Sequence, residues 1–322
     1  MDYVIIVLGI AMVLWGADKL TEGASAVATR MNIPEIIIGL TIVAFGTSMP
    51  EFCVSMVSAL KGTTDIAIGN VVGSNIMNAL LIVGVAAAVT PITISRSTVK
   101  KDIPFGIAAS LLLIVLCLDK DISRIDAGIL FAFFLVFMYV TLKGAKTNGE
   151  PAAVTEEAKA KVPSYGKAGA LIFIGLACLI IGSNLFVDSA SNVARAWGVS
   201  DAIIGLTIVA GGTSLPELAT SVVAARKGQS AIAIGNVLGS NIFNILFILG
   251  VTGLICPMSA EGFSLIDLGL MGGSMLLLWL FCFTKFRVER WEGWVLALIY
   301  IAYIVWLVMG AMAVPEVAVP AN

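Results

Sequence analysis

The sequence contains no histidine and little charge, and both shortages exclude classes of function. Without histidine, the chain lacks the usual proton relay near neutral pH and the commonest transition-metal ligand. Charged residues make up 12% of the chain and the formal net charge is -2, so we predict no nucleic-acid partner. The five cysteines lie in or at the ends of apolar segments without metal-ligand spacing, which favours a packing role.

Hydrophobic residues, by contrast, make up 59% of the chain, and the mean hydropathy of +1.02 excludes a soluble domain. Most apolar segments are near the length of about 20 residues that a membrane-spanning helix needs. Continuous runs of this length exclude barrel strands, so we predict an all-α polytopic membrane protein with ten transmembrane helices in a lipid bilayer. The ten segments are 3–28, 36–60, 66–90, 103–118, 126–142, 168–195, 202–225, 231–255, 264–284 and 291–313.

The distribution of lysine and arginine predicts how the chain is oriented in the membrane. If the N-terminus is outside, the inner loops carry 14 of these residues and the outer loops carry four. We therefore expect both termini outside the cell membrane. The first segment has neither a basic flank nor a small-residue cleavage pattern, so we expect a retained helix and not a signal peptide.

One part of the sequence occurs twice, with a constant offset of 166 residues. Residues 39–52 read GLTIVAFGTSMPEF and residues 205–218 read GLTIVAGGTSLPEL, a match at 11 of 14 positions. At the same offset, AIGNVVGSNIMN at 67–78 matches AIGNVLGSNIFN at 233–244 at 10 of 12 positions. Each unit holds five helices, an odd number, so the two units must have opposite orientations in the membrane. The sequence thus predicts two inverted five-helix repeats.

The duplication divides the chain into three parts. They are a first five-helix repeat at 1–142, a cytoplasmic linker at 143–167 and a second five-helix repeat at 168–322. The linker is polar and contains proline, and its length is that of a flexible connection and not of a domain. The fourth, fifth, ninth and tenth segments contain few polar residues, so we interpret them as lipid-facing scaffold.

Each copy of the first motif places a carboxylate beside a proline within an apolar run. A charge in hydrocarbon is costly, so Glu51 and Glu217 are candidates for a functional site. On a regular helix, three further positions share the face of each glutamate. They are Ala44, Thr47 and Ser48 in the first copy and Ala210, Thr213 and Ser214 in the second. Pro50 and Pro216 each leave a helix carbonyl without its usual donor, and such breaks are where transporters place coupling ions.

The second motif, GNxxGSNxxN, adds polar residues to the third and eighth segments. Ser74 and Asn78 lie four residues apart on one helix face, as do Ser240 and Asn244. The small residues of the motif would also let helices approach closely, and packing alone is the alternative interpretation. The repeated Asn, Ser, Thr and Glu side chains supply more polarity than packing needs, which favours an ion site.

The first and sixth segments become mixed in polarity in their second halves. Asp18 and Glu22 lie four residues apart on one face, and Asp188 is at the position equivalent to Glu22. Two interpretations stay open for these acids. They either lie near a helix end and reach water, or they line ion entrances on opposite sides of the membrane.

Together these side chains predict an all-oxygen cation site. Ca²⁺ takes about 6 to 8 oxygen ligands in flexible geometry, and Na⁺ can use subsets of the same set. Softer metals would require sulfur or imidazole, and Mg²⁺ dehydrates reluctantly. The two glutamates supply a charge of -2, which offsets one Ca²⁺, and proton competition is expected at a pair of buried carboxylates. We predict no catalytic activity, no cofactor and no obligate protein partner, with the ions as transported substrates.

The paired GTSxPE and GSNxxN elements, the five-plus-five repeat and the length resemble the sodium/calcium exchangers of the cation/calcium antiporter superfamily, in a compact prokaryotic-type form. The resemblance implies a central Ca²⁺ held by Glu51, Glu217, Thr47, Thr213 and nearby backbone. It implies flanking Na⁺ positions at Ala44, Ser48, Ser74, Ala210, Ser214 and Ser240, with Asn78 and Asn244 near the centre. Such relatives exchange about three Na⁺ for one Ca²⁺, which would make transport electrogenic.

The sequence departs from some members of this family at two places. Some microbial relatives have an aspartate at the position of Asn244, and potassium-dependent relatives carry an extra acid in this helix. The neutral Asn244 argues against a K⁺ requirement, and the short linker predicts no Ca²⁺-sensing module. Three other functions remain as alternatives: a proton-coupled Ca²⁺ antiporter, a passive cation channel and a membrane scaffold without transport activity.

Overall fold

The computed structural model describes residues 1–147, 162–199, 201–260 and 264–313. The first repeat contains eight α-helices, three π-helical turns, one 3-10 turn and two short strands among these residues. Its elements are α1 (Asp2–Met31), α2 (Glu35–Ile38), η1 (Gly39–Val43), α3 (Ala44–Thr47), α4 (Met49–Leu60), α5 (Thr64–Met77), η2 (Asn78–Ile82), α6 (Val83–Val89), β1 (Ile92–Thr93), η3 (Thr98–Asp102), α7 (Ile103–Leu116), η4 (Cys117–Asp119), β2 (Asp121–Ile122) and α8 (Arg124–Thr147).

The second repeat follows the same order after the linker, without counterparts of η3 and η4 among the described residues. Its elements are α10 (Tyr165–Ala196), α11 (Asp201–Ile204), η5 (Gly205–Val209), α12 (Ala210–Thr213), α13 (Leu215–Arg226), α14 (Ser230–Ile242), η6 (Phe243–Ile248), α15 (Leu249–Ile255), β3 (Met258–Ser259), α16 (Leu265–Lys285), β4 (Arg287–Val288) and α17 (Arg290–Ala313). The ends of the predicted linker are helical, because α8 continues to Thr147 and α10 begins at Tyr165. Residues 148–161 of that linker lie outside the described part of the chain.

The helices account for ten membrane spans, as the sequence predicts. Over the described ranges, eight helices are long and apolar enough to cross a membrane, and two bent pairs complete ten if each pair is one span. One bent pair joins Glu35–Thr47 to Met49–Leu60 at 45°, and the other joins Thr207–Thr213 to Leu215–Arg226 at 58°. The bends fall at equivalent places in the two repeats. The chain is an all-α, multi-pass membrane protein.

Two short strand pairs show directly that the repeats are inverted. β1 and β3 are repeat equivalents, because Ile92 and Met258 differ by the offset of 166. β1 pairs antiparallel with β4, whereas β3 pairs with β2. One membrane span, Thr98–Asp119, separates β1 from β2, so the two pairs lie at opposite ends of the helices. Equivalent loops therefore lie on opposite sides of the membrane, and the predicted fold class is confirmed.

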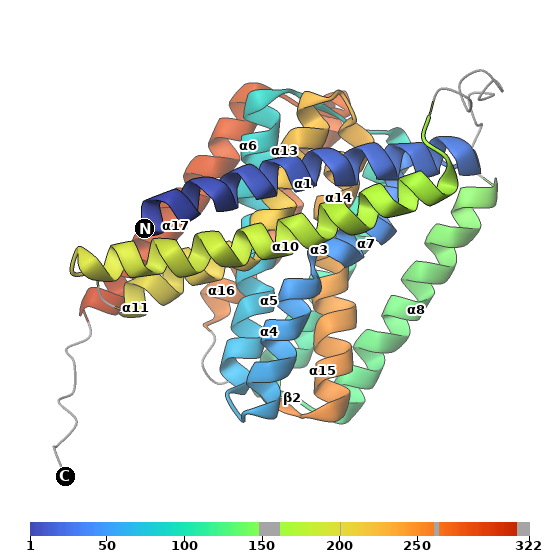
Figure 1. Ribbon diagram of the computed structural model, residues 1–322. Coiled ribbons are helices and arrows are strands. Elements are labelled where there is room, and N and C mark those ends of the chain that lie inside the picture. Colours follow the sequence, from blue (N-terminus) through green and yellow to red (C-terminus); the bar gives the residue numbers. More distant parts are fainter. Residues whose placement is uncertain (148–161, 200, 261–263, 314–322) are drawn as a thin grey trace, which may run out of the picture.

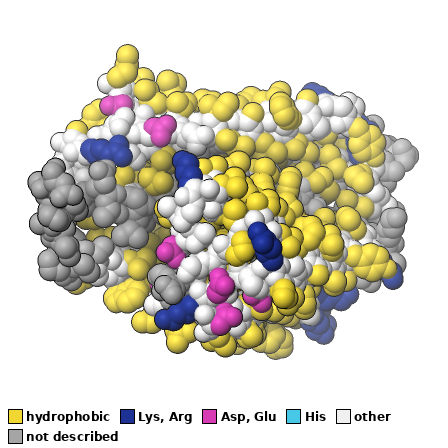
Figure 2. Space-filling view, turned by 90° about the horizontal axis from the view of Figure 1, so that it is seen from below, with side chains coloured by type: hydrophobic (Ala, Val, Ile, Leu, Met, Phe, Trp, Pro, Cys, Tyr) yellow, Lys and Arg dark blue, Asp and Glu magenta, His cyan; other side chains and the backbone are white. Residues whose placement is uncertain are grey.

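The two spans that carry the second motif form the core of the molecule. In the span Ser230–Ile255, 94% of the most apolar window is buried, and in Thr64–Val89 the share is 78%. In each of the other six single-helix spans it is 33% or less. Hydrophobic side chains cover much of the face that Figure 2 shows, with basic and acidic groups scattered among them. The polar motif residues thus lie in the most enclosed part of the bundle.

The long helices α1 and α10 form a closely packed antiparallel pair that crosses obliquely over the other helices (Figure 1). Glycines spaced by seven residues line their contact. A Cβ added at Gly9 would lie 2.8 Å from the carbonyl oxygen of Gly182, and one at Gly16 would lie 2.7 Å from that of Gly175. Small residues allow such close backbone approach between helices in a membrane. This seam makes α1 and α10 a single two-helix unit.

Candidate cation site

Two broken spans meet at the centre of the molecule. Ser48 separates α3 from α4 and Ser214 separates α12 from α13, each with a backbone conformation outside the regular helix. Pro50 and Pro216 occupy the first turn of the new helix, where the missing N–H leaves no hydrogen bond unmade. The proline motif therefore starts a second helix segment at an angle to the first, which agrees with the predicted break.

Glu51 and Glu217 occupy the first turns of α4 and α13 and are fully buried. The positive end of a helix dipole favours a carboxylate at this position. Each glutamate also accepts a hydrogen bond from the serine at the other repeat's break: Ser214 Oγ donates to Glu51 Oε1 at 2.9 Å, and Ser48 Oγ donates to Glu217 Oε1 at 3.0 Å. The two carboxylates interact electrostatically. The structure thus joins the two repeats through a reciprocal pair of serine–glutamate contacts.

The core spans contribute one more hydroxyl to each half of this cluster. Ser74 Oγ lies 3.1 Å from Ser214 Oγ, and Ser240 Oγ lies 3.5 Å from Glu217 Oε1. All of these serine side chains are buried. The four serines that the sequence singles out therefore gather around the two glutamates.

Thr47 and Thr213 contact asparagines of the opposite repeat. Thr47 Oγ1 donates to Asn236 Oδ1 at 3.0 Å, and Thr213 Oγ1 lies 3.5 Å from Asn70 Oδ1. Asn236 Nδ2 in turn donates to the main-chain carbonyl of Glu217 at 3.3 Å, and Asn70 Nδ2 donates to that of Glu51 at 3.0 Å. Asn70 and Asn236 thus fix the backbone at each glutamate, a role that the motif pattern did not reveal.

Asn78 and Asn244 lie in π-helical turns, which are wider than an α-helix and frequent at functional sites. Both side chains are buried, and their Oδ1 atoms have no hydrogen-bond partner among the described residues. The same is true of the Oε2 atoms of Glu51 and Glu217. A buried oxygen without a donor is costly unless something else satisfies it. These four oxygens on the motif residues are therefore candidate cation ligands.

The two alanines of the predicted set are the first residues of α3 and α12. Ala44 is fully buried in α3, where Gly239 of α14 packs against it so closely that a Cβ on the glycine would lie 2.6 Å from the Ala44 Cβ. Ala210 is the first residue of α12, and its side chain lies outside the described part of the structure. α3 is therefore packed tightly against α14 of the second repeat.

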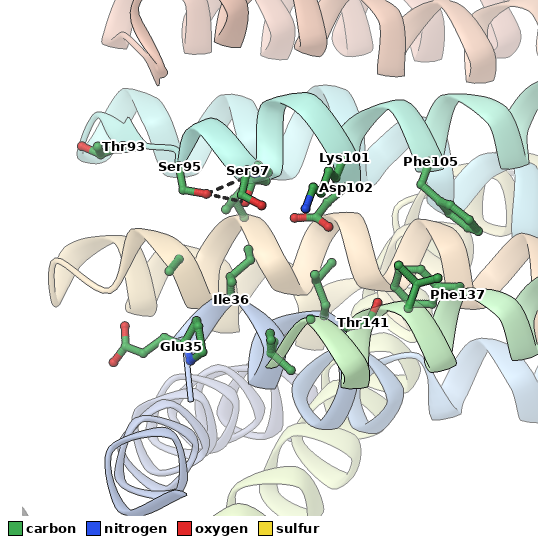
Figure 3. A pocket seen from close by; sticks show the side chains of 18 residues that line it. Glu35, Ile36, Thr93, Ser95, Ser97, Lys101, Asp102, Phe105, Phe137 and Thr141 are labelled. Atoms are coloured by element: carbon green, nitrogen blue, oxygen red, sulfur yellow. Dashed lines mark hydrogen bonds between the residues drawn. The ribbon is translucent and has the colours of Figure 1, made fainter. Parts of the chain in front are cut away.

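A cavity of about 420 Å³ lies elsewhere, at the end of the helices where β1 is found (Figure 3). Polar side chains such as Lys101 and Asp102 line one part of it, and Phe105 and Phe137 line another. None of the predicted site residues lines this cavity. The carboxylate pair is instead enclosed by packed helices, and the two features are separate.

Ten spans in two inverted repeats around a buried, cross-repeat pair of carboxylates define a secondary transporter of cations. The family model described as sodium/calcium exchanger protein matches residues 1–143 and 167–309. The chain belongs to this family, whose members are ion exchangers and not enzymes. Its fold and motifs therefore make it a cation antiporter of the Ca²⁺-transporting class.

Individual relatives are similar to this chain along nearly its whole length. The putative antiporter CaxA of Alkalimonas amylolytica is 37% identical over 307 residues, which cover 93% of this chain and 96% of the relative. The sodium/calcium exchanger MaX1 of Methanosarcina acetivorans is 35% identical, covering 94% and 97%. The solved structure of the sodium-calcium exchanger NCX_Mj, soaked with Na⁺ and Ca²⁺, superposes with a TM-score of 0.83 at 32% identity, covering 95% and 98%.

Proposed function

We propose that the protein exchanges Na⁺ for Ca²⁺ across the membrane by alternating access. The observation that carries this proposal is the buried pair Glu51 and Glu217, each held by a serine of the opposite repeat. Two buried carboxylates supply the charge that one Ca²⁺ needs, and each has one oxygen without a hydrogen-bond partner among the described residues. Because the ligands come from both repeats, a relative motion of the repeats would expose the site to one side or the other.

Neutral oxygens around the carboxylates supply the proposed Na⁺ positions. The central Ca²⁺ would use Glu51, Glu217, Thr47 and Thr213, and the flanking Na⁺ ions would use Ala44, Ser48, Ser74, Ala210, Ser214 and Ser240, with Asn78 and Asn244 near the centre. The named exchangers MaX1 and NCX_Mj support Na⁺ as the coupling ion. We propose about three Na⁺ per Ca²⁺, as the family resemblance implies, so that each cycle moves net charge.

We place the protein in the cell membrane with the linker side in the cytoplasm, on the lysine and arginine bias of the loops. Contacts between loops agree with this orientation. Arg30, in the last turn of α1, donates to the main-chain oxygens of Val162 and Pro163 in the linker. β1 and β4, which flank the third and tenth spans, would share that side.

Transport assays in liposomes test the proposed exchange. Purified protein is reconstituted in Na⁺-loaded liposomes, and ⁴⁵Ca²⁺ uptake is measured with and without an outward Na⁺ gradient, at fixed pH and without K⁺. We expect uptake that requires the Na⁺ gradient and does not need K⁺. Uptake that ignores Na⁺ but follows an imposed proton gradient would replace the proposal by proton-coupled antiport. Uptake without any coupling gradient would indicate a passive channel.

α1 packs against α13, and the repeat-equivalent contact between α10 and α4 is much weaker among the described residues. Lys227, at the end of α13, makes three contacts with α1: its Nζ lies 2.7 Å from Asp18 Oδ1, 2.8 Å from the Asp18 carbonyl oxygen and 3.0 Å from Thr21 Oγ1. The repeat equivalents of Lys227 and Asp18 are Lys61 and Asn184. Both are exposed, and neither side chain forms a hydrogen bond or ion pair within the described ranges. The contact thus ties α1 to α13 on the linker side alone.

Replacing Lys227 by methionine is expected to increase opening of the site toward the linker side. A half-exposed ion pair is worth little, so the expected effect is about a two- to fivefold lower half-saturating Ca²⁺ concentration from that side. The measurement is Ca²⁺-dependent exchange in vesicles of known orientation. Lys61→Met is the matched control, because Lys61 is the unpaired equivalent and should leave the half-saturation unchanged. Equal behaviour of the two variants would contradict the role of this ion pair.

A further inference from the structure

Two asparagines beside the predicted ligands are not themselves part of the predicted set. Asn75 and Asn241 are repeat equivalents, and each is buried, with 1% of its surface exposed. Asn75 Nδ2 donates to the main-chain carbonyl of Asn241 at 3.2 Å, and Asn241 Nδ2 points to the carbonyl of Asn75 at 3.5 Å. The two side chains therefore bind each other's backbone across the contact between the repeats.

This arrangement fixes which end of each amide faces which way. A main-chain carbonyl only accepts hydrogen bonds, so the NH₂ group of each asparagine must face it. The Oδ1 atom is then directed to the next residue, which must present a donor. Asn75 Oδ1 accepts from Asn244 Nδ2 at 3.1 Å, and Asn241 Oδ1 accepts from Asn78 Nδ2 at 3.0 Å.

The orientation passes on to the residues of the cation site. Because the NH₂ groups of Asn78 and Asn244 are bound in this way, it is their Oδ1 atoms that stay without a partner among the described residues. If either amide flipped, it would present N–H groups, which repel a cation, in place of an oxygen.

We propose that Asn75 and Asn241 are positioning residues, which hold the amide oxygens of Asn244 and Asn78 ready for a cation. The inference rests on the proposed function of the site. It assigns a task to the third residue of each GSN triplet, whereas the serine before it and the asparagine three residues later are candidate ligands. Each series of hydrogen bonds begins at a main-chain carbonyl of the opposite repeat. The orientation of the amides therefore depends on the docking of the two repeats.

An alanine at position 75 removes the acceptor that orients Asn244. Without that acceptor the Asn244 amide is free to turn its NH₂ group toward the site, so we expect about tenfold weaker Ca²⁺ binding in Asn75→Ala. The readout is equilibrium ⁴⁵Ca²⁺ binding to the purified full chain. Thermal unfolding measured in parallel reports any loss of packing between the repeats.

Asn244→Asp provides the background that separates positioning from packing. Both terminal atoms of an aspartate side chain are oxygens, so either orientation presents an oxygen to the cation. Asn75→Ala should then change Ca²⁺ binding less than about twofold. The Ca²⁺ affinities with and without Asn75→Ala are compared within each background, because the added charge of Asn244→Asp alters the affinity by itself. Asn241→Ala with Asn78→Asp repeats the comparison in the other half, in case a position 75 variant fails to fold.

The outcomes separate the inference from the function on which it rests. A tenfold loss that disappears in the aspartate background supports positioning. An equal loss in both backgrounds, or no loss in Asn75→Ala and Asn241→Ala, overturns it while Ca²⁺ binding by the wild-type chain stands. If the wild-type chain itself binds no Ca²⁺, the proposed function fails, and the inference fails with it.

Discussion

Glu51→Gln is expected to abolish Ca²⁺ transport while the protein stays folded, and Glu217→Gln is expected to do the same. Glutamine matches the size of glutamate and keeps an oxygen to accept from Ser214 or Ser48. It removes one of the two negative charges in a buried site, where a divalent cation without matching charge is strongly disfavoured. We expect transport to fall by roughly a hundredfold or more.

⁴⁵Ca²⁺ uptake into Na⁺-loaded liposomes measures this effect, and thermal unfolding confirms that each variant is folded. Asp65→Asn is a matched control, because it removes the same charge from an exposed acid in the first turn of α5. The control should transport Ca²⁺ normally. Normal uptake by either glutamine variant would remove the site assignment.

The second large effect is expected at the seam between α1 and α10. Gly16→Leu would place a side chain against backbone atoms, since even a Cβ there lies 2.7 Å from the carbonyl oxygen of Gly175 and 2.9 Å from the amide nitrogen of Leu179. Backbone in a helix cannot yield as a flexible side chain can, so the two helices must separate. Overpacking of this kind costs about 3 kcal/mol of stability.

A melting experiment on the purified protein tests this expectation, with Gly169→Leu as the control. Gly169 lies on α10 as well, but no heavy atom would come within 4 Å of a Cβ added there. We expect the Gly16 variant to melt several degrees lower and the Gly169 variant to melt like wild type. Equal melting temperatures would show that the glycine seam is not needed for stability.

The features that the sequence predicted are those that follow from composition and repetition. The duplication at an offset of 166 residues, with five helices in each unit, predicts the inversion, and the strand pairs β1–β4 and β2–β3 show it. The same repetition identifies the glutamates, the serines and the helix breaks, because two equivalent positions rarely share such polarity without a common task. These predictions needed no knowledge of how the repeats dock.

The features that the sequence did not predict depend on how the two repeats dock and on local helix geometry. The helical-face argument selects Ser74 and Asn78 and passes over Asn75, whose partners lie on the other repeat. The π turns at η1, η2, η5 and η6 also break the regular spacing that this argument assumes. The glycines at positions 9 and 16, in contrast, carried a visible seven-residue signal for the α1–α10 seam. Attention to small residues would have predicted that contact.

Equilibrium ⁴⁵Ca²⁺ binding to the purified protein at a series of Na⁺ concentrations tests the central claim most directly. One site built from Glu51 and Glu217 cannot serve both ions at once, so we expect about one Ca²⁺ per chain, displaced steeply by Na⁺. Binding should be lost in Glu51→Gln at any Na⁺ concentration. Ca²⁺ binding that is indifferent to Na⁺, or that survives in both glutamine variants, would contradict a shared site for the two ions.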